Sequence, residues 1–189
     1  AAVIGAMQTI AQLDVPLHVV GLVPAADNMV SGNAYRPQEV VTASNGKTIE
    51  IISTDAEGRL LLADALVYAQ RYNPTAVVDI ATLTGSITVA LGHAMTGVYS
   101  NADEVVEKLN DAAQLTSELI WRMPMSPEYG NSLKSDTADT KNSGGRAGGA
   151  GVAAHFLSNF VDYNWAHVDM AGMLTNEGLI PYQPKHSAR

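Results

Sequence analysis

Short runs that are apolar almost throughout alternate along this chain with longer segments whose apolar residues recur at helical spacing. The runs at 17–23 (LHVVGLV), 75–81 (TAVVDIA) and 164–170 (NWAHVDM) have the composition of buried strands. The segments at 60–72 and 102–117 have the helical period. This alternation predicts an α/β domain with a mixed, largely parallel central sheet that is flanked by helices on both faces.

The other elements are predicted from periodicity and turn residues. Residues 1–13 have one apolar helical face but begin without an initiating Met or a capping residue, which suggests a chain cut from a longer one. Asn45-Gly46 lies between two β-branched runs and predicts a hairpin over 40–52. Further predictions are helices at about 86–91 and over 149–161, a strand near 94–99, and a long polar loop over 124–149 that is functional or covers another surface.

Composition favours one domain with an extensive covered surface. A chain of 189 residues suits a single domain with a continuous core. Apolar residues make up 47% of the chain and charged residues only 16%, against roughly 25% charged residues in typical soluble domains. Oligomerisation is the simplest explanation for so few charges.

Charge, cysteine content and hydropathy exclude several classes of function. The net charge is −8 and no Lys/Arg cluster is longer than a pair, so a nucleic-acid partner is not expected. Cysteine is absent, which excludes disulfides, thiolate metal sites and a cysteine nucleophile, and makes a reducing cytosol the simpler compartment. No apolar run approaches the roughly 20 residues that span a bilayer, so we expect a soluble, cytoplasmic protein without a membrane partner.

The clearest chemical signal is STDAEGRL at 53–60, where a strand is expected to give way to a helix. Asp55 and Glu57 lie two positions apart, so their carboxylates can converge on one divalent cation such as Mg²⁺, Mn²⁺ or Zn²⁺. Gly58 permits close approach of the backbone, and Arg59 at the start of a helix can hold an anion. On this spacing alone, metal chemistry and a plain structural ion pair are equally supported.

STDAEGRL resembles the signature NTDAEGRL of the leucyl aminopeptidase family, also called cytosol aminopeptidases, with Ser53 where the family has Asn. The likeness continues in the family's order along essentially the whole chain. It includes SGNAYRP (31–37), NGKT (45–48), LLLADALVYA (60–69), DIATLTGS (79–86), WRMP (121–124) and NWAHVDMAG (164–172). The resemblance implies that the α/β domain is the catalytic domain of a metal-dependent aminopeptidase.

The resemblance further implies a hydrolytic site with two divalent metal ions, Mn²⁺ or Zn²⁺. It assigns Glu57 to both metals and Asp55 to one of them, through its carboxylate and its backbone carbonyl. Arg59 is implied to hold a bicarbonate ion that acts as general base toward the metal-activated water. The implied substrates are peptides with a neutral, preferably leucine-like first residue.

A pocket for the first side chain of the peptide is implied as well. It maps onto Thr82, Gly85, Ala171 and Leu174, with Leu83 supplying backbone contacts. Gly85 and Ala171 are small and leave room for a side chain the size of Leu or Met, and Leu174 provides an apolar wall. Selectivity by such a wall should be modest, because one methylene is worth only about 1–3 kcal/mol.

Part of the family's site has no counterpart in this chain. The family uses two further aspartates and two lysines, all upstream of the point where this chain begins, and has a terminal helix beyond the region where it ends. No catalytic lysine of the family is matched by Lys47, Lys108, Lys134, Lys141 or Lys185. We therefore expect residues 1–189 to be a partial catalytic domain, truncated at both ends and inactive alone, of a parent enzyme that forms homohexamers.

Two classes of function stay open. The first is the metal-dependent aminopeptidase, and the second is a non-catalytic homologue or assembly subunit that keeps the fold without the chemistry. Intact Asp55, Glu57 and Arg59 favour the enzyme, because a non-catalytic copy would be free to lose them. The upstream lysines and aspartates of the parent protein would decide between the two.

Other motifs are interpreted as structural. His167 and Asp169 alternate along a strand and suit a metal pair by spacing, but a structural hydrogen-bonded pair is the preferred interpretation. GAGVAA at 149–154 fits a weak dinucleotide fingerprint, yet a polar segment precedes it instead of a strand, so no nucleotide role is expected. Three isolated histidines are also expected to be structural: His18, His93 and His155.

Overall fold

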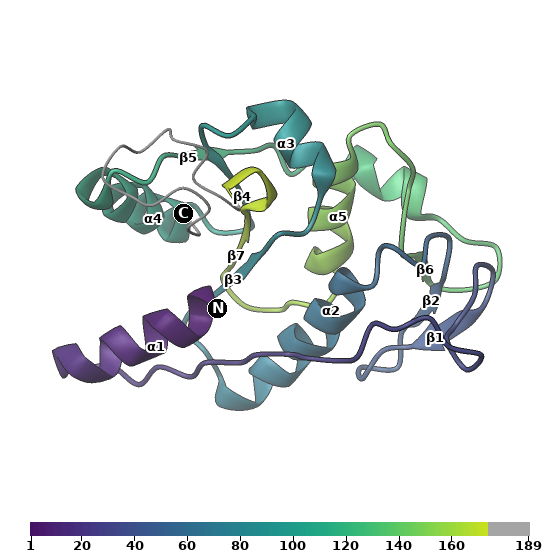
Figure 1. Cartoon of the computed structure of the whole chain (residues 1–189), viewed down its shortest axis with the longest axis horizontal. Helices are drawn as coiled ribbons and strands as arrows, with labels where there is room; N and C mark the ends of the chain where they lie inside the picture. The colour runs from purple at the N-terminus through teal and green to yellow at the C-terminus, as the bar shows by residue number, and fades with distance from the viewer. Residues whose placement is uncertain (174–189) are drawn as a thin grey trace.

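The computed structural model describes residues 1–173, in which helices pack on two mixed sheets (Figure 1). The larger sheet has four strands in the order β3 (Val77–Ala81), β7 (Trp165–Asp169), β4 (Thr96–Ser100) and β5 (Ile120–Arg122). β3 is parallel to β7, β4 is parallel to β5, and β4 runs antiparallel to β7. The predicted α/β fold with a mixed sheet is therefore confirmed.

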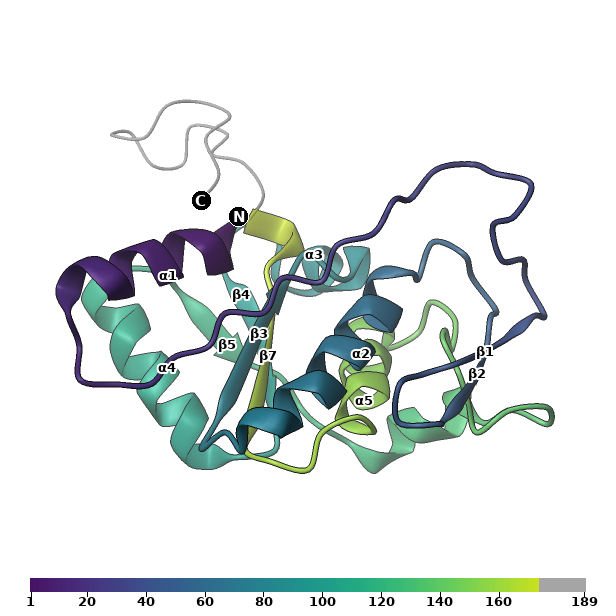
Figure 2. The ribbon, with the colours of Figure 1, turned by 90° about the horizontal axis from the view of Figure 1, so that it is seen from below.

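Helices cover both faces of the larger sheet (Figure 2). On one face, α4 (Asp103–Thr116) packs against apolar side chains that include Ala166 of β7. On the other, α2 (Gly58–Ala69) and α5 (Gly149–Ser158) enclose the core that contains Trp165. Successive residues of a strand point to opposite faces, so the neighbours Trp165 and Ala166 serve two different cores.

Two further α-helices also lie where the sequence predicts them. α1 (Ala2–Leu13) is the first element of the chain, and α3 (Gly85–Leu91) follows β3. The Thr84 side chain caps α3 by accepting a hydrogen bond from the backbone N–H of Ile87. Three short 3₁₀ helices complete the set: η1 (Gln70–Tyr72), η2 (Pro127–Leu133) and η3 (Ala171–Met173).

The predicted hairpin belongs to the smaller sheet. β1 (Val40–Thr42) and β2 (Thr48–Glu50) pair antiparallel, and Gly46 takes the positive φ of 87° that the turn requires. β6 (Thr140–Lys141) then joins β2 in parallel. This short strand and η2 lie inside the segment predicted as a polar loop, and together with β5 they are elements that the sequence pattern did not reveal. All three are seven residues or shorter, so none develops a clear period.

The predicted buried strand at 17–23 is wrong. No strand forms there, and Leu17 is 72% exposed. The segment runs as extended chain between α1 and the hairpin (Figure 2). A strand needs a neighbour to satisfy its backbone N–H and C=O groups, and the part of the chain that the structure describes pairs none with this run. An apolar run therefore indicates a tendency to be buried but does not identify the partner.

The contact between β2 and β6 is expected to respond to acid. The Asp139 carboxylate accepts hydrogen bonds from the backbone N–H and the hydroxyl of Thr48, both at 2.8 Å, and these bonds lower the pKa of Asp139. A carboxyl whose pKa is lower in the folded state stabilises the fold above its unfolded pKa and loses that effect as pH falls through the folded pKa. Thr48→Val removes one of the two bonds and should raise the pKa of Asp139, measured by NMR titration of its carboxyl carbon. An unchanged pKa would contradict this assignment.

Candidate functional site

The candidate site forms where the carboxyl ends of β3 and β7 lie side by side. These strands are parallel and in register from Val77–Trp165 to Ala81–Asp169, so the loops that follow them leave from the same edge of the sheet. The backbone N–H of Met170 donates to the carbonyl of Ala81 and continues the pairing beyond the strands. Thr82 and Gly85, which follow β3, and Ala171, which follows β7, are thereby brought to the same edge.

One buried carboxylate joins the two loops. Asp169 accepts hydrogen bonds from the backbone N–H of Leu83 at 3.0 Å and from the Thr84 hydroxyl at 2.7 Å. It also accepts weaker bonds, at 3.4 Å, from the backbone N–H groups of Thr84 and Ala171. Since Asp169 is fully engaged by these groups, its role is to fix the loop backbone, and its spacing from His167 does not make a metal pair.

The acidic turn approaches this edge from α2. Leu83 places a methyl carbon 3.6 Å from the position that a Cβ on Gly58 would occupy, so the loop after β3 lies against the first residue of α2. Asp55 is exposed, Glu57 is half-buried, and Arg59 is only 8% exposed. Three separate segments of the predicted site, the turn at 53–59 and the loops after β3 and β7, therefore converge in space.

The two acids of the turn are not engaged as structural groups. Within residues 1–173, neither the Asp55 nor the Glu57 carboxylate accepts a hydrogen bond or forms an ion pair. The structural ion pair with Arg59, one of the two interpretations that the spacing allowed, is therefore not formed. Unpaired carboxylates two residues apart provide the hard oxygen ligands that divalent cations accept, so this donor set fits a metal.

The donor set is also incomplete. Over the described residues, no group of three or more His, Asp or Glu side chains is arranged to hold a metal ion. Asp55 and Glu57 can supply two ligands, while Asp169 is occupied by the loop backbone. Two ions would each need about four or more ligands, so further ligands must come from elsewhere.

Arg59 is a buried cation with spare hydrogen-bonding capacity. Its Nη1 donates to the backbone carbonyl of Asn142 at 2.7 Å, and its buried Nε has no hydrogen-bond partner within the described chain. Burial lowers the pKa of the Arg59 guanidinium, while the nearby Asp169 and Glu57 carboxylates act in the opposite direction. Arginine keeps its charge at neutral pH, so the free donor is suited to an anion.

The predicted pocket residues are placed in part. Thr82 and Gly85 are exposed and Ala171 is half-buried, all at the edge described above. A Cβ added to Gly85 would meet no atom within 4 Å, so open space lies beside this residue. Leu174, the predicted apolar wall, lies outside the described residues. The assignment of these residues to a side-chain pocket stays a prediction.

His167 has a structural partner of its own. Its Nδ1 lies 2.6 Å from a carboxylate oxygen of Asp79, whose other oxygen accepts the indole N–H of Trp165 at 2.6 Å. All three side chains are buried. The expected hydrogen-bonded pair of His167 and Asp169 is therefore wrong as a pair: each is a buried structural group, but His167 bonds to Asp79 and Asp169 bonds to the loop after β3.

His93 and the segment before GAGVAA were also assigned from the sequence. Nδ1 of His93 lies 2.7 Å from the carbonyl of Gly172. The strand nearest before GAGVAA is β6, which ends at Lys141, and residues 142–148 separate it from α5. The dinucleotide motif has a strand running directly into the glycine turn, and residues 142–148 stand in that place here.

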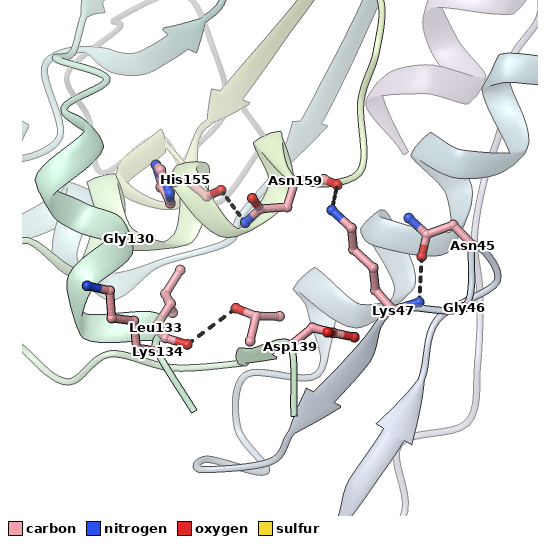
Figure 3. A pocket seen from close by; sticks show the side chains of 10 residues that line it. Asn45, Gly46, Lys47, Gly130, Leu133, Lys134, Asp139, His155 and Asn159 are labelled. Atoms are coloured by element: carbon pink, nitrogen blue, oxygen red, sulfur yellow. Dashed lines mark hydrogen bonds between the residues drawn. The ribbon is translucent and has the colours of Figure 1, made fainter. Parts of the chain in front are cut away.

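A separate cavity of about 440 Å³ lies beyond the far end of α5 (Figure 3). It is lined by the hairpin turn at 45–47, by Lys134 and Asp139, by His155 of α5 and by Asn159, the residue that follows α5. Lys47 closes one side by donating to the carbonyl of Asn159 at 2.8 Å. None of the predicted site residues lines this cavity, so it is distinct from the candidate site.

Asn142 contacts the site, and Tyr35 is affected by the charge of Glu57, but neither residue was identified from the sequence. The backbone carbonyl of Asn142 accepts a hydrogen bond from Arg59. Asn142 lies in the polar segment predicted as a loop, where no single residue is distinguished by its spacing. Tyr35 lies close to Glu57, and burial together with that carboxylate raises the pKa of Tyr35. Tyr35 is part of SGNAYRP, which carried the resemblance without a role being assigned to this residue.

Comparison with known proteins agrees with this geometry. Residues 1–188 match the cytosol aminopeptidase family, catalytic domain. A probable cytosol aminopeptidase of Geobacter sulfurreducens is 50% identical over 186 residues, which cover 98% of this chain and 38% of that protein. A probable cytosol aminopeptidase of Methylobacillus flagellatus is 51% identical over 179 residues, which cover 94% of this chain and 36% of that protein.

A solved structure is also similar. A mutant of tomato leucine aminopeptidase superposes with a TM-score of 0.87 at 44% sequence identity, covering 93% of this chain and 36% of that one. The chain thus spans little more than a third of the length of these relatives. No helix within residues 1–173 has the length and apolar character needed to cross a membrane.

Proposed function

The chain belongs to the cytosol aminopeptidase family, and on that basis we propose that a longer protein containing it removes neutral, preferably leucine-like residues from the N-termini of peptides. Residues 1–189 would form part of the catalytic domain of that protein. The observation that carries the proposal is that, among residues 1–173, the Asp55 and Glu57 carboxylates have no hydrogen-bond or ion-pair partner and lie beside the buried Arg59. The proposed location is the cytoplasm.

The proposed chemistry divides among these side chains. Two divalent ions, Mn²⁺ or Zn²⁺, would supply a nucleophilic water near neutral pH and polarise the scissile carbonyl. Glu57 would contribute its carboxylate to the ligands of both ions, and Asp55 would contribute its carboxylate and its backbone carbonyl to those of one ion. Arg59 keeps a buried donor free to hold bicarbonate as the general base. The loops fixed by Asp169 provide the walls for the first side chain of the peptide.

The chain alone is proposed to be inactive. Asp55 and Glu57 cannot fill two coordination shells, and no third acid or histidine joins them in residues 1–173. In a homohexamer of the parent protein, surfaces that are exposed here would be covered. Leu115 of α4 is 88% exposed, and Val89 and Trp121 are exposed as well, which agrees with the low charge content.

The test is hydrolysis of leucyl p-nitroanilide by the full-length protein with Mn²⁺ or Zn²⁺, before and after removal of metal by a chelator. Metal-dependent release of the chromophore is expected. The alternative, a non-catalytic homologue or assembly subunit, predicts no release in either state. Loss of a metal-binding aspartate from the upstream part of the parent sequence would also favour that alternative.

Gly85→Val tests the proposed pocket. The added side chain enters the open space beside Gly85, so the fold should tolerate it while the room for a leucine side chain is reduced. We expect kcat/KM for leucyl p-nitroanilide to fall by about 10- to 100-fold, and that for alanyl p-nitroanilide to fall much less, because a methylene or two of lost fit is worth about 1–3 kcal/mol. An equal fall for the two substrates would contradict the placement of Gly85 in the pocket.

A further inference from the structure

Asn142 holds the acidic turn with almost every polar atom it has. Its Oδ1 accepts hydrogen bonds from the backbone N–H groups of Ile52 at 2.8 Å and of Ser53 at 3.2 Å. Its Nδ2 donates to the carbonyl of Ser53 at 2.7 Å and, more weakly, to that of Ala56 at 3.5 Å. Its own backbone carbonyl accepts Nη1 of Arg59 at 2.7 Å.

These bonds involve residues on both sides of Asp55 and Glu57 in the sequence, and none of them is made by either carboxylate. Apart from them, the described chain holds the turn by one backbone bond within it, from the N–H of Ala56 to the carbonyl of Ser53 at 3.3 Å, and by the start of α2, where the Glu57 carbonyl accepts from the backbone N–H groups of Leu60 and Leu61. Asn142 follows β6 directly and lies beside the turn. The backbone N–H of Asn142 donates to the carbonyl of Glu50 and so extends the pairing of β2 with β6. A residue some 85 positions away thus determines the shape of the turn.

Only asparagine satisfies this arrangement. Two N–H donors face Oδ1 and two carbonyls face Nδ2, so the amide has one orientation in which every group is paired. Asn142 is fully buried. A water molecule could replace one of its side-chain hydrogen bonds only if the substituted residue left a cavity large enough to hold it. Aspartate has the same shape but would place an oxygen against the carbonyls of Ser53 and Ala56.

We propose that Asn142 is a positioning residue for the metal site: its side-chain amide holds the turn at 53–59 in the shape that lets Asp55 and Glu57 bind cations together and keeps Arg59 beside them. This inference rests on the proposed function. Groups that orient metal ligands from behind typically contribute 10- to 100-fold to metal affinity.

The test is calorimetric titration of Mn²⁺ into the chelator-treated full-length protein. Asn142→Ala is expected to raise the Mn²⁺ Kd by about 10- to 100-fold. Asn101→Ala is the matched control, because Asn101 also bridges two backbone segments, accepting from the N–H of Trp165 and donating to the carbonyl of Tyr163, but at the opposite edge of the larger sheet. The control should keep the wild-type Mn²⁺ Kd within about twofold, while the lost bonds are expected to lower its unfolding temperature.

A second variant keeps the test decisive if Asn142→Ala does not fold. Asn142→Asp retains the volume and both acceptor contacts but loses the two donations, and it too should raise the Mn²⁺ Kd at least tenfold. Far-UV circular dichroism establishes that each variant is folded. A folded Asn142 variant with the wild-type Mn²⁺ Kd would overturn the positioning role while leaving the proposed function intact. A wild-type protein that binds no Mn²⁺ would overturn both.

Discussion

Glu57→Gln is expected to lower kcat/KM for leucyl p-nitroanilide by about a thousandfold in the full-length protein. The substitution keeps the size of the side chain but replaces a carboxylate, proposed to contact both metal ions, by a neutral amide. Stabilisation of the transition state by bound metal amounts to several kcal/mol, and each 1.4 kcal/mol corresponds to a factor of about ten in rate. The measurement is steady-state kinetics at saturating Mn²⁺.

The control for this substitution is Glu107→Gln. Glu107 is an exposed acid on α4, far from the edge where β3 and β7 end, so the variant removes the same charge without touching the site. It should keep the wild-type kcat/KM within about twofold. If Glu57→Gln behaved like this control, the assignment of Glu57 as a metal ligand would be wrong.

Asp79→Ala is expected to destabilise the domain by about 3–5 kcal/mol. The carboxylate accepts the indole N–H of Trp165 and lies 2.6 Å from Nδ1 of His167, and all three side chains are buried. Nε2 of His167 has no hydrogen-bond partner in residues 1–173. The imidazole ring therefore has no second hydrogen bond to rely on when the bond of Nδ1 to Asp79 is lost. Each buried donor that loses its acceptor costs about 1–3 kcal/mol, and the alanine leaves a cavity as well.

Urea unfolding followed by circular dichroism measures this effect, with Asp79→Asn as the matched variant. The asparagine preserves the volume and one acceptor, so it should cost clearly less than the alanine. Because Asp79 lies at the centre of β3 and not in the loop after it, metal affinity in the folded variants should change little. A loss below about 1 kcal/mol for Asp79→Ala would show that Trp165 and His167 find other partners.

Much of the fold follows from local sequence patterns. The helical period from Leu60 onward predicts α2, and Asn45-Gly46 predicts the hairpin that Gly46 makes possible. The apolar run at 75–81 predicts β3. The run at 17–23 has the same composition but no partner strand in the described chain, and its failure shows that composition cannot supply the pairing. Pairing is a property of the whole chain.

The candidate site was predictable only where it is local. Asp55, Glu57 and Arg59 lie within five residues, so their spacing in the sequence carries the signal. The contacts that shape the turn and the loops join residues more than 80 positions apart, as in the bonds of Asn142 to Ser53 and of Asp169 to Leu83. In the sequence alone, Asn142 cannot be distinguished from the other polar residues of its segment, because the signal lies in its contacts in the folded structure.

The most direct test of the metal site is a crystal structure of the full-length protein soaked with Zn²⁺, in which anomalous scattering locates the ions. Our interpretation predicts two ions at the turn, with carboxylate oxygens of Asp55 and Glu57 about 2.0–2.2 Å from them. Ions bound elsewhere, with both side chains directed away from any cation, would contradict it.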